Sequence, residues 1–500
     1  MAAMDAASLA AASATTMKAV NFFATPITQR IATHPTTLTS PIPHTKPNVH
    51  ALCLPNSNPR SRAISLITRC SIKPDTDTTD NEKEQNSTVE PNLNSEPTNP
   101  STPFSNDALS SPISTSFSSS NTKGLVLGLG FENSWDSAEV GSPVVKRFLG
   151  DEEERWYMWY YGKSSSNPNP GLDSIGLAVS SNGVHWERGV GQVQSSQDVG
   201  AVINCGKDWW AFDTQSIRPS EVVVMSSSKV RASSAVYWLY YTGYSAEEAD
   251  NISNQSQEIN LENPKRFLLD GLISDKNGGI GKIFKSLPGL AISQDGRHWA
   301  RIEGEHHSGA LFDVGLQGEW DSSFIAAPHV VFHESGDLRM YYHSFDLEMG
   351  NYSIGMARSR DGIKWVKLGK IIGGGRSGYF DELGAMNPCV VRNRKDGEYL
   401  MAYEGVGGDG GRSIGLAVSP DGLKDWTRLK DDEVVLKASE DCGWDNKGVG
   451  SPCLVQMDGE EDEWRLYYRG VGIEGRTGMG MAVSQGSDVT KFKRCAGFHL

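Results

Sequence analysis

The chain has 500 residues, with 61 acidic against 47 basic side chains and a formal net charge of −14 at pH 7. A surface this acidic repels phosphate backbones, so nucleic acid is excluded as the expected partner. No apolar run approaches the ~20 residues that span a bilayer, and we expect no membrane span.

The first 122 residues differ in composition from the rest. Residues 1–72 contain one acidic side chain, Asp5, among six basic ones and many Ser, Thr and Ala. This is typical of an organelle transit peptide, and Ile67–Cys70 resembles the cleavage context of plastid precursors, so we expect delivery to the chloroplast stroma. Residues 73–122 are rich in Ser, Thr, Asn, Pro and Glu and cannot bury enough apolar surface to fold. We expect a disordered acidic linker there, followed by one folded domain over 123–500.

One sequence segment returns along the folded part of the chain, in four full copies and one truncated copy. The copies are IGLAVSSNGVHW from Ile175, LAISQDGRHW from Leu290, IGMARSRDGIKW from Ile354, IGLAVSPDGLKDW from Ile414 and MGMAVSQGSD from Met479. Five copies of one unit predict a closed ring of repeats.

Two further segments stand upstream of each copy in a constant order. Aromatic segments cover 156–162, 237–243, 338–344, 399–405 and 464–470, and apolar runs begin further upstream at Pro143, Pro219, Pro328, Pro388 and Pro452. Alternating apolar and polar residues, with Asn-Gly or Asp-Gly pairs in four copies, indicate strands joined by hairpin turns, and glycines in mid-segment argue against helices. We expect an all-β fold, a five-bladed β-propeller with four antiparallel strands per blade.

The second unit carries an insertion at about 245–286. It follows an aromatic strand and contains several acidic residues and a Gly-Gly pair at 278–279. The sequence leaves two readings open, a mobile lid over a site or an unstructured surface loop.

Propeller geometry predicts where a site lies. The segment after each aromatic strand and the segment entering each inner strand share one face, so function is expected among these ten segments. They supply Lys163, Tyr244, His343, Glu404 and Arg469 after the aromatic strands, and Ser142, Arg218, Ala327, Asn387 and Ser451 before the inner-strand prolines.

Residues that recur at one repeat position are expected to be structural, and those that break the repeat are free for chemistry. A Trp-Asp or Phe-Asp pair stands six or seven residues before each inner-strand proline, and its aspartates are expected to be turn formers that accept backbone N–H bonds. They are Asp136, Asp213, Asp321, Asp381 and Asp445.

The residues that break the repeat are the candidate ligand-binding residues Arg218, Asn387, His329, His343 and Arg469. Arg218 offers a fork of donors to a carboxylate or to sugar hydroxyls, or else forms an ion pair with a repeat aspartate. His329 and His343 either titrate near neutrality or serve as satisfied structural residues.

Glu404 is a candidate general acid if aromatic neighbours desolvate it and raise its pKa. The alternative is a carboxylate paired with Arg412 or Arg469.

Five cysteines follow the leader, with no CxxC pair and no metal-ligand spacing. Cys389 and Cys453 follow inner-strand prolines, and we expect small apolar fillers near the ring axis rather than a redox pair. No metal site and no nucleotide, haem or other cofactor is expected.

The order of these segments resembles the five-bladed β-propeller glycosidase superfamily of arabinanases, β-xylosidases, invertases and levansucrases, including glycoside hydrolase families 43 and 32. The resemblance covers about Leu125 to the C-terminus. It implies three carboxylates on the inner strands of the first three blades, in Asp-Pro, Asp-Pro and Glu-x-Pro contexts, that act as nucleophile or base, transition-state stabiliser and general acid.

The chain departs from that pattern at all three positions, which are occupied by Ser142, Arg218 and the pair Ala326-Ala327. One proton-transfer group alone is worth about 10² to 10⁴ in rate, so the usual mechanism cannot operate without them. A displaced site that uses Asp136, Asp213 or Asp321 together with Glu404 remains an alternative.

Three functional hypotheses follow. The first is a plastid carbohydrate-binding protein with weak or absent hydrolase activity, and the second is an active glycoside hydrolase of furanosidase type that uses displaced carboxylates. The third is a non-catalytic scaffold for a protein partner. The missing carboxylates favour the first and third, because the site and not the fold decides function.

Overall fold

The computed structural model describes residues 122–149, 154–165, 173–225, 236–248, 272–273, 282–430, 433–440, 442–457 and 463–495. The chain divides into two units, Met1–Ile64 and Ser65–Leu500, and all described residues belong to the second. The described residues do not include the expected transit peptide, almost all of the expected linker and most of the 245–286 insertion. The choice between a lid and a surface loop for the insertion therefore also lies outside the described residues.

The described part of the chain is all-β, with one short 3-10 turn at Ile473–Gly475. Its strands form four sheets. The first sheet contains β2 (Glu139–Leu149), β3 (Glu154–Lys163), β4 (Asp173–Ser180), β5 (Glu187–Arg188) and β6 (Gly200–Asn204). The second contains β7 (Ser216–Met225), β8 (Val236–Glu248), β9 (Leu272–Ile273), β10 (Lys282–Ser293) and β11 (Trp299–Ile302).

The third sheet contains β12 (Ala326–Glu334), β13 (Asp337–Asp346), β14 (Asn351–Ser359), β15 (Trp365–Ile372), β16 (Gly384–Arg392), β17 (Tyr399–Val406), β18 (Arg412–Ser419) and β19 (Thr427–Arg428). The fourth contains β20 (Gly448–Gln456), β21 (Trp464–Val471), β22 (Thr477–Gln485), β23 (Asp488–Arg494) and, from the other end of the domain, β1 (Leu125–Leu127). Strand pairing within the sheets is antiparallel, apart from one parallel pair, Tyr352 with Gly384, which joins two repeats into the third sheet.

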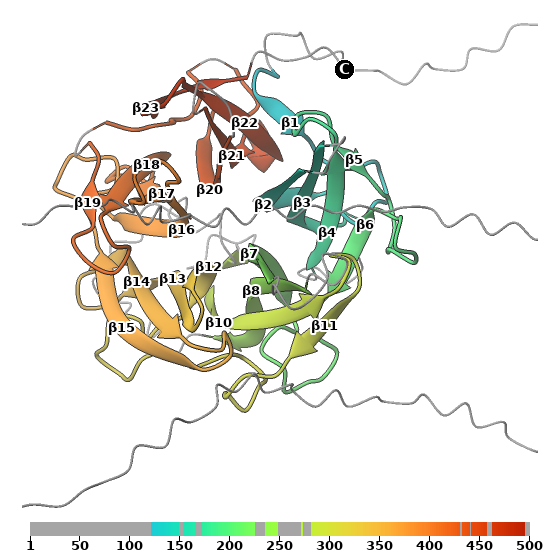
Figure 1. The fold of residues 1–500 in the computed structure, drawn as a ribbon, viewed down its shortest axis with the longest axis horizontal. Helices are drawn as coiled ribbons and strands as arrows, with labels where there is room; N and C mark the ends of the chain where they lie inside the picture. The colour runs from blue at the N-terminus through green and yellow to red at the C-terminus, as the bar shows by residue number, and fades with distance from the viewer. Residues whose placement is uncertain are drawn as a thin grey trace, which may run out of the picture. The chain divides into compact units, whose positions relative to one another are not determined.

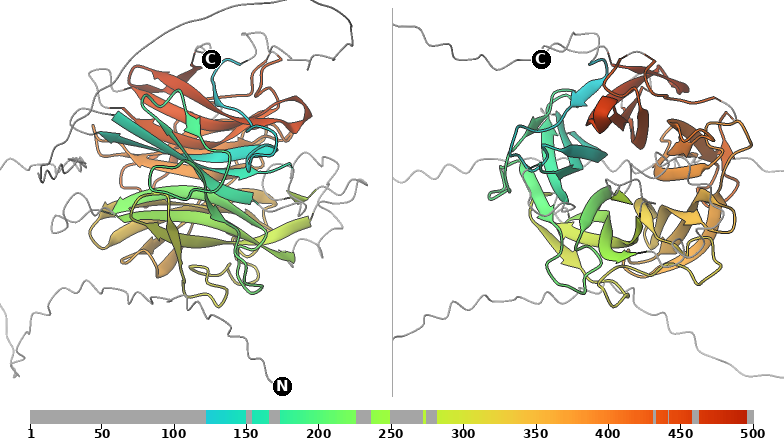
Figure 2. Two further views of the ribbon diagram at one scale, coloured as in Figure 1. Left: turned by 90° about the vertical axis from the view of Figure 1, so that its right-hand side faces the viewer. Right: turned by 180° about the vertical axis from the view of Figure 1, so that it is seen from behind.

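The first strands of the five repeats contact one another in a closed cycle, β2 with β7, β12, β16, β20 and again β2. Figure 1 shows these strands innermost around a common axis, and the view from behind shows the same cyclic order (Figure 2, right). The core lies between successive repeats. One cluster packs Trp159 of the first repeat against Leu239 of the second, and another packs Met158 against Tyr467, from the last repeat.

The repeat aspartates are structural and lie in turns, as the sequence predicts, but their carboxylates bind side chains rather than backbone N–H groups. Each is at most 2% exposed and accepts a hydrogen bond of 2.9 to 3.0 Å from a tyrosine hydroxyl of the second strand. Each also pairs with a basic side chain, at 2.7 to 3.1 Å. We call each group of an aspartate, its tyrosine and its basic partner a clamp. The five clamps are Asp136 with Tyr160 and Arg188, Asp213 with Tyr241 and Arg301, Asp321 with Tyr342 and Lys367, Asp381 with Tyr403 and Arg428, and Asp445 with Tyr468 and Arg494. A buried carboxylate needs such partners, because an unpaired buried charge is costly.

A second recurring contact ties a repeat to the next at four of the five junctions; at the junction of the fourth and fifth repeats the equivalent residue is Ala402, which has no donor in its side chain. An aromatic side chain of the second strand donates a hydrogen bond to the carbonyl of a glycine in the following hairpin turn: Trp159 to Gly296, Tyr240 to Gly362, Tyr341 to Gly422 and Tyr467 to Gly183. The distances are 2.9, 3.2, 2.6 and 2.8 Å. The Tyr467 contact joins the last repeat to the first.

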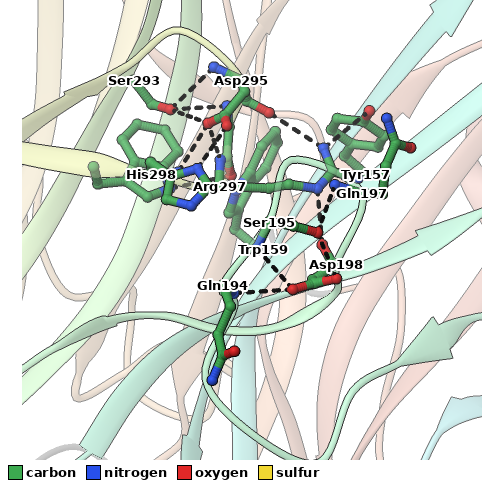
Figure 3. Close-up of polar contacts among 12 residues, drawn as sticks. Tyr157, Trp159, Gln194, Ser195, Gln197, Asp198, Ser293, Asp295, Arg297 and His298 are labelled. Atoms are coloured by element: carbon green, nitrogen blue, oxygen red, sulfur yellow. Dashed lines mark hydrogen bonds and ion pairs between the residues drawn. The ribbon is translucent and has the colours of Figure 1, made fainter.

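The junction of the first two repeats carries additional contacts, which Figure 3 shows. The Arg297 guanidinium stacks on the Tyr157 ring, with 5.3 Å to the ring centroid, and donates to the Asp198 carbonyl at 2.8 Å. The Asp198 carboxylate in turn accepts the amides of Gln194 and Ser195 at 3.0 and 2.7 Å. These bonds fix the segment that leads into β6 against the turn after β10.

Candidate ligand-binding site

Five residues occupy one equivalent position, immediately before the proline of each inner strand, and we call them the pre-proline ring. Each is partly exposed while its neighbours on both sides are buried. Since the flanking residues pack against the sheets, the ring residues are those that face solvent at this level of the inner strands. They are Ser142, Arg218, Ala327, Asn387 and Ser451.

Four of the five ring residues have left-handed backbone, with φ of 47° at Ser142, 50° at Ala327, 49° at Asn387 and 45° at Ser451. This conformation is unfavourable for residues other than glycine and is further disfavoured before proline. At each of these points the register with the second strand shifts, as in a β-bulge. Arg218 is the exception, because in its strand the shift comes after Pro219.

Side chains of the preceding repeat hold three of these bulges. The Ala327 amide donates to the Thr242 hydroxyl at 2.8 Å, the Asn387 amide to Nδ1 of His343 at 3.2 Å, and the Ser451 amide to Oε2 of Glu404 at 2.9 Å. The three acceptors share one position of the second strand, which Tyr161 and Arg469 occupy in the remaining repeats. We call this position the support position. Its residue type changes from repeat to repeat, so each ring residue has a different neighbour.

Glu404 is held by more than the Ser451 amide. Its carboxylate accepts Nη1 of Arg412 at 2.6 Å and the side-chain amide of Asn387 at 2.8 Å. Glu404 is 3% exposed, and the partner is Arg412 rather than Arg469. The geometry is that of the paired carboxylate, one of the two readings the sequence left open, and it fixes the Asn387 side chain within the ring.

Arg218 lies against two tyrosines and a carboxylate that is not one of the repeat aspartates. Its guanidinium carbon lies 4.6 Å from the Tyr161 ring centroid and 5.4 Å from that of Tyr244. The charge partner is Asp173, whose Oδ2 is 4.0 Å from Nε of Arg218 and which accepts a hydrogen bond from the Ser216 hydroxyl. The two tyrosines and Asp173 therefore orient the guanidinium at the edge of the ring.

Two carboxylates beside the ring, Glu139 and Asp173, were not among the residues singled out from the sequence. Glu139 accepts hydrogen bonds of 2.6 Å from the Tyr161 hydroxyl and from Arg469. Burial would raise the pKa of Glu139, but the guanidinium groups of Arg469 and Arg218 hold it below its usual value. Burial raises the pKa of Asp173 to about 6, against the opposing effect of Arg218.

A sequence signal for both existed. Glu139 stands three residues before Ser142, within a segment expected on this face, and Asp173 begins β4, the strand that follows the aromatic strand of the same repeat. What the sequence does not reveal is the strand register, which pairs Lys163 with Glu139 of one neighbouring strand and with Asp173 of the other. Spacing along the chain gave no such pairing.

The two candidate histidines are separated. His343 occupies the support position beside Asn387. His329 lies beyond the ring, with Nδ1 3.1 Å from Glu221 and Nε2 2.9 Å from the Val390 carbonyl. Burial lowers the pKa of His329 below its usual value, although the Glu221 carboxylate opposes this. Both nitrogens of His329 have protein partners, which fits a structural histidine between inner strands.

The displaced carboxylates proposed from the sequence do not meet Glu404. The structure places Asp136, Asp213 and Asp321 in the buried clamps described above, where each is bound to a tyrosine and a basic side chain. Glu404 is bound to a different set of residues at the ring. Within the described residues, these hydrogen bonds and ion pairs do not join the two groups.

One group among the described residues has ligand atoms close enough to hold a metal, namely His333, Glu334 and Asp337. It lies at the other end of the inner strand from the ring. The Asp337 carboxylate already accepts bonds from Arg339 and Arg358, at 2.9 and 2.7 Å. Two guanidinium groups compete there with any cation.

Cys389 and Cys453 are buried, and each sulfur accepts a backbone amide of the next inner strand at 3.3 Å. This agrees with small fillers near the axis. The described part of the chain contains no helix with the length and apolarity of a membrane span.

No protein-family model and no curated protein matches the chain. Solved structures do match, and the three that follow cover 72% to 74% of this chain at TM-scores of 0.45 to 0.46. A thermostable family-43 glycoside hydrolase is 17% identical and 95% covered. A glycosyl hydrolase from Bacteroides ovatus is 14% identical and 93% covered. An N-acetylgalactosamine deacetylase from F. plautii, solved with a blood group B trisaccharide, is 13% identical and 95% covered.

Proposed function

We propose that the chain binds a carbohydrate at the pre-proline ring and hydrolyses it weakly or not at all. The observation that supports this proposal is the set of side-chain types in the ring. Its five partly exposed residues are two serines, an alanine, an asparagine and an arginine, at a level where a glycosidase of the resembled superfamily needs carboxylates. Hydroxyl, amide and guanidinium groups orient a polyhydroxylated ligand, and they transfer no proton at neutral pH.

The carboxylates next to the ring support binding rather than catalysis. Glu404 accepts three hydrogen bonds and Glu139 accepts two, so both are engaged as acceptors that fix neighbouring donors. Orienting polar groups in this way reduces the entropy that a ligand must overcome on binding.

A second candidate function, hydrolysis, is favoured by one observation. The strand register places Glu139 and Asp173 on the two sides of Lys163, and their pKa values move in opposite directions, as those of a catalytic base and acid do. In that case protonated Asp173 would donate to the leaving oxygen and Glu139 would accept a proton from the attacking water.

The experiment is thermal unfolding of the full chain with a panel of pentoses, fructans, arabinan and xylan fragments, with products assayed in the same samples. A ligand at 100 times its dissociation constant adds roughly 2.7 kcal/mol to stability. Stabilisation without products supports the proposal. Products that disappear in Asp173→Asn favour hydrolysis, and the absence of stabilisation by any sugar moves the function to a protein scaffold.

We further propose that the domain is a five-bladed propeller. The cycle of inner strands, the five clamps and the five core clusters between successive repeats support this count, and the parallel pair between Tyr352 and Gly384 accounts for the joined sheet.

A chloroplast location is also proposed, on the composition of residues 1–72. Residues 1–72 fused to a fluorescent protein should carry it into chloroplasts of leaf cells and be removed there. Retention of the uncut fusion in the cytosol would contradict the proposal.

A further inference from the structure

We infer that Cys389 and Cys453 form a modification site at which hydrogen peroxide oxidises the two thiols to a disulfide between β16 and β20. The inference goes beyond the proposed carbohydrate binding and does not depend on it. In the reduced chain the two side chains fill space near the axis, and their contact with each other gives the pair this additional chemistry.

The two cysteines occupy equivalent positions in neighbouring repeats. Each directly follows the proline of its inner strand, and the two strands, β16 and β20, pack against each other. Sγ of Cys389 lies 3.3 Å from the amide nitrogen of Leu454, the residue bonded to Cys453. The Cys389 side chain also forms a hydrogen bond with that of Cys453. Backbone proximity and side chains that face each other are the geometry that a disulfide requires.

The two thiols differ in reactivity. The hydrogen bond from Cys389 lowers the pKa of the Cys453 thiol below its usual value; burial opposes this effect, and the ammonium group of Lys146 adds to it. Lys146 comes from β2 of the first repeat and forms an ion pair with Glu221. The same hydrogen bond, together with burial, raises the pKa of the Cys389 thiol. Since the thiolate is the reactive form, Cys453 is the nucleophile and Cys389 is the thiol that completes the disulfide.

The recessed position of the pair selects a small oxidant. Cys453 is 9% exposed and Cys389 is 4% exposed. The side chain of Lys146, whose charge acts on both sulfurs, is 32% exposed. Hydrogen peroxide is little larger than water and fits such a restricted approach, whereas a disulfide carried by another protein needs a thiol at the surface.

The reaction consumes one peroxide molecule and releases two water molecules. The Cys453 thiolate attacks a peroxide oxygen, so that an S–O bond forms, the O–O bond breaks, and the departing hydroxide takes up the proton that the thiol released. The Cys389 sulfur then attacks the sulfenic sulfur of Cys453. The S–S bond forms, the S–O bond breaks, and the Cys389 proton leaves with the hydroxide as water. The two sulfurs are oxidised and the two peroxide oxygens are reduced.

The test treats the folded full chain with increasing hydrogen peroxide, blocks the remaining thiols with N-ethylmaleimide in denaturant, and maps tryptic peptides by mass spectrometry without reduction. Cleavage after Lys and Arg leaves Cys389 in peptide 377–392 and Cys453 in peptide 448–465. We expect the two peptides to be joined, with a mass lower by two hydrogen atoms than their sum, and to separate after treatment with dithiothreitol. The exposed Cys442 reports general oxidation in the same sample.

Two variants assign the roles of the two thiols. In Cys389→Ser, the sulfenic acid of Cys453 should persist and be trapped by dimedone, because no second thiol is in place to attack it. In Cys453→Ser, Cys389 should remain a thiol at the same peroxide concentration. Circular dichroism without peroxide shows whether each variant is folded.

A pair of lysine variants tests the activation of Cys453. Lys146→Met should slow disulfide formation roughly threefold, because a higher thiol pKa lowers the thiolate fraction more than it raises the nucleophilicity of each thiolate. Lys370→Met is the matched control, since the Lys370 side chain is 34% exposed and is bound to Asp346 at 2.7 Å. It should leave the rate unchanged.

The wild-type chain alone decides the inference, whether or not the variants fold. Oxidation of Cys442 while the peptides of Cys389 and Cys453 stay separate would overturn it, and so would joining of these peptides only in urea. Equal rates in the two lysine variants would overturn the role of Lys146. Dimedone labelling of Cys389 in Cys453→Ser, without labelling of Cys453 in Cys389→Ser, would overturn the order of the two steps.

Discussion

The hydroxyl of Tyr467 on β21 donates a hydrogen bond to the Gly183 carbonyl, 2.8 Å away, although 284 residues separate them. The neighbouring Arg465 donates to the Asn182 carbonyl at 2.7 Å. Together these bonds attach the last repeat to the hairpin turn of the first. The pre-proline ring depends on this closure, because Glu139 of the first repeat is held by Arg469 of the last.

Tyr467→Phe should therefore lower the free energy of unfolding. The variant removes the hydroxyl and leaves the Gly183 carbonyl without this donor, at a cost of about 1 kcal/mol. Urea unfolding measures the change. Tyr157→Phe is the control, since the Tyr157 hydroxyl makes only a 3.4 Å contact with Arg297. An equal loss of unfolding free energy in both variants would show that the Tyr467 hydrogen bond does not stabilise the fold more than this contact.

Asp213→Asn should destabilise the fold without reducing sugar affinity. Asp213 is 1% exposed and bound to Tyr241 and Arg301, so the neutral amide weakens a charge-assisted pair, at a cost of about 2 to 3 kcal/mol. Calorimetric titration with the best sugar at a temperature where the variant is folded gives the affinity. An intact fold with lost hydrolysis or binding would instead place Asp213 in a displaced active site.

Ala327→Gly should raise stability by about 0.5 to 1 kcal/mol. Ala327 has φ of 50°, where glycine carries no steric penalty, and this relief exceeds the entropy that glycine adds to the unfolded chain. The matched control is the adjacent Ala326→Gly, at a buried strand position without positive φ, which should lose about 0.5 to 1 kcal/mol. Equal effects at the two positions would mean that the ring backbone stores no strain.

The stability of the chain should depend on pH through Asp173. Its pKa of about 6 in the folded state exceeds the ~3.9 of an unfolded aspartate. Because its pKa is raised in the folded state, Asp173 makes its full contribution to stability at pH values below the pKa of the unfolded state. This contribution, about 3 kcal/mol, is lost as pH rises through about 6. Between pH 4 and pH 7, Asp173→Asn should therefore lose less stability than the wild type. Urea unfolding at both pH values checks this, with the exposed Asp208→Asn as control. The same change in wild type and Asp173→Asn would contradict the prediction.

The strand order and the structural role of repeated residues were predictable from the sequence, because both follow from local periodicity. All five aromatic segments lie within β3, β8, β13, β17 and β21. The aspartate partners were not predictable. Tyr342 and Lys367 lie 21 and 46 positions beyond Asp321, and only the register of three strands brings the three side chains together.

The position of the candidate residues in the fold was predictable, but their contacts were predictable only in part. Arg218, Asn387, His343, Glu404 and Arg469 do lie at or beside the ring, because the strand order within each repeat fixes which strand ends meet. The choice of partner depends on side-chain geometry across repeats. Arg469 binds Glu139, 330 positions away, and no pattern within one repeat indicates that pair.

The measurement that tests carbohydrate binding at the ring most directly is isothermal titration of the full chain with the sugar that stabilises it most, with wild type and Asn387→Ala side by side. We expect a single binding event in the wild type, at least tenfold weaker binding in Asn387→Ala, and sugar recovered uncleaved from the cell. Unchanged affinity in Asn387→Ala, or rapid conversion of the sugar to products, would contradict the account.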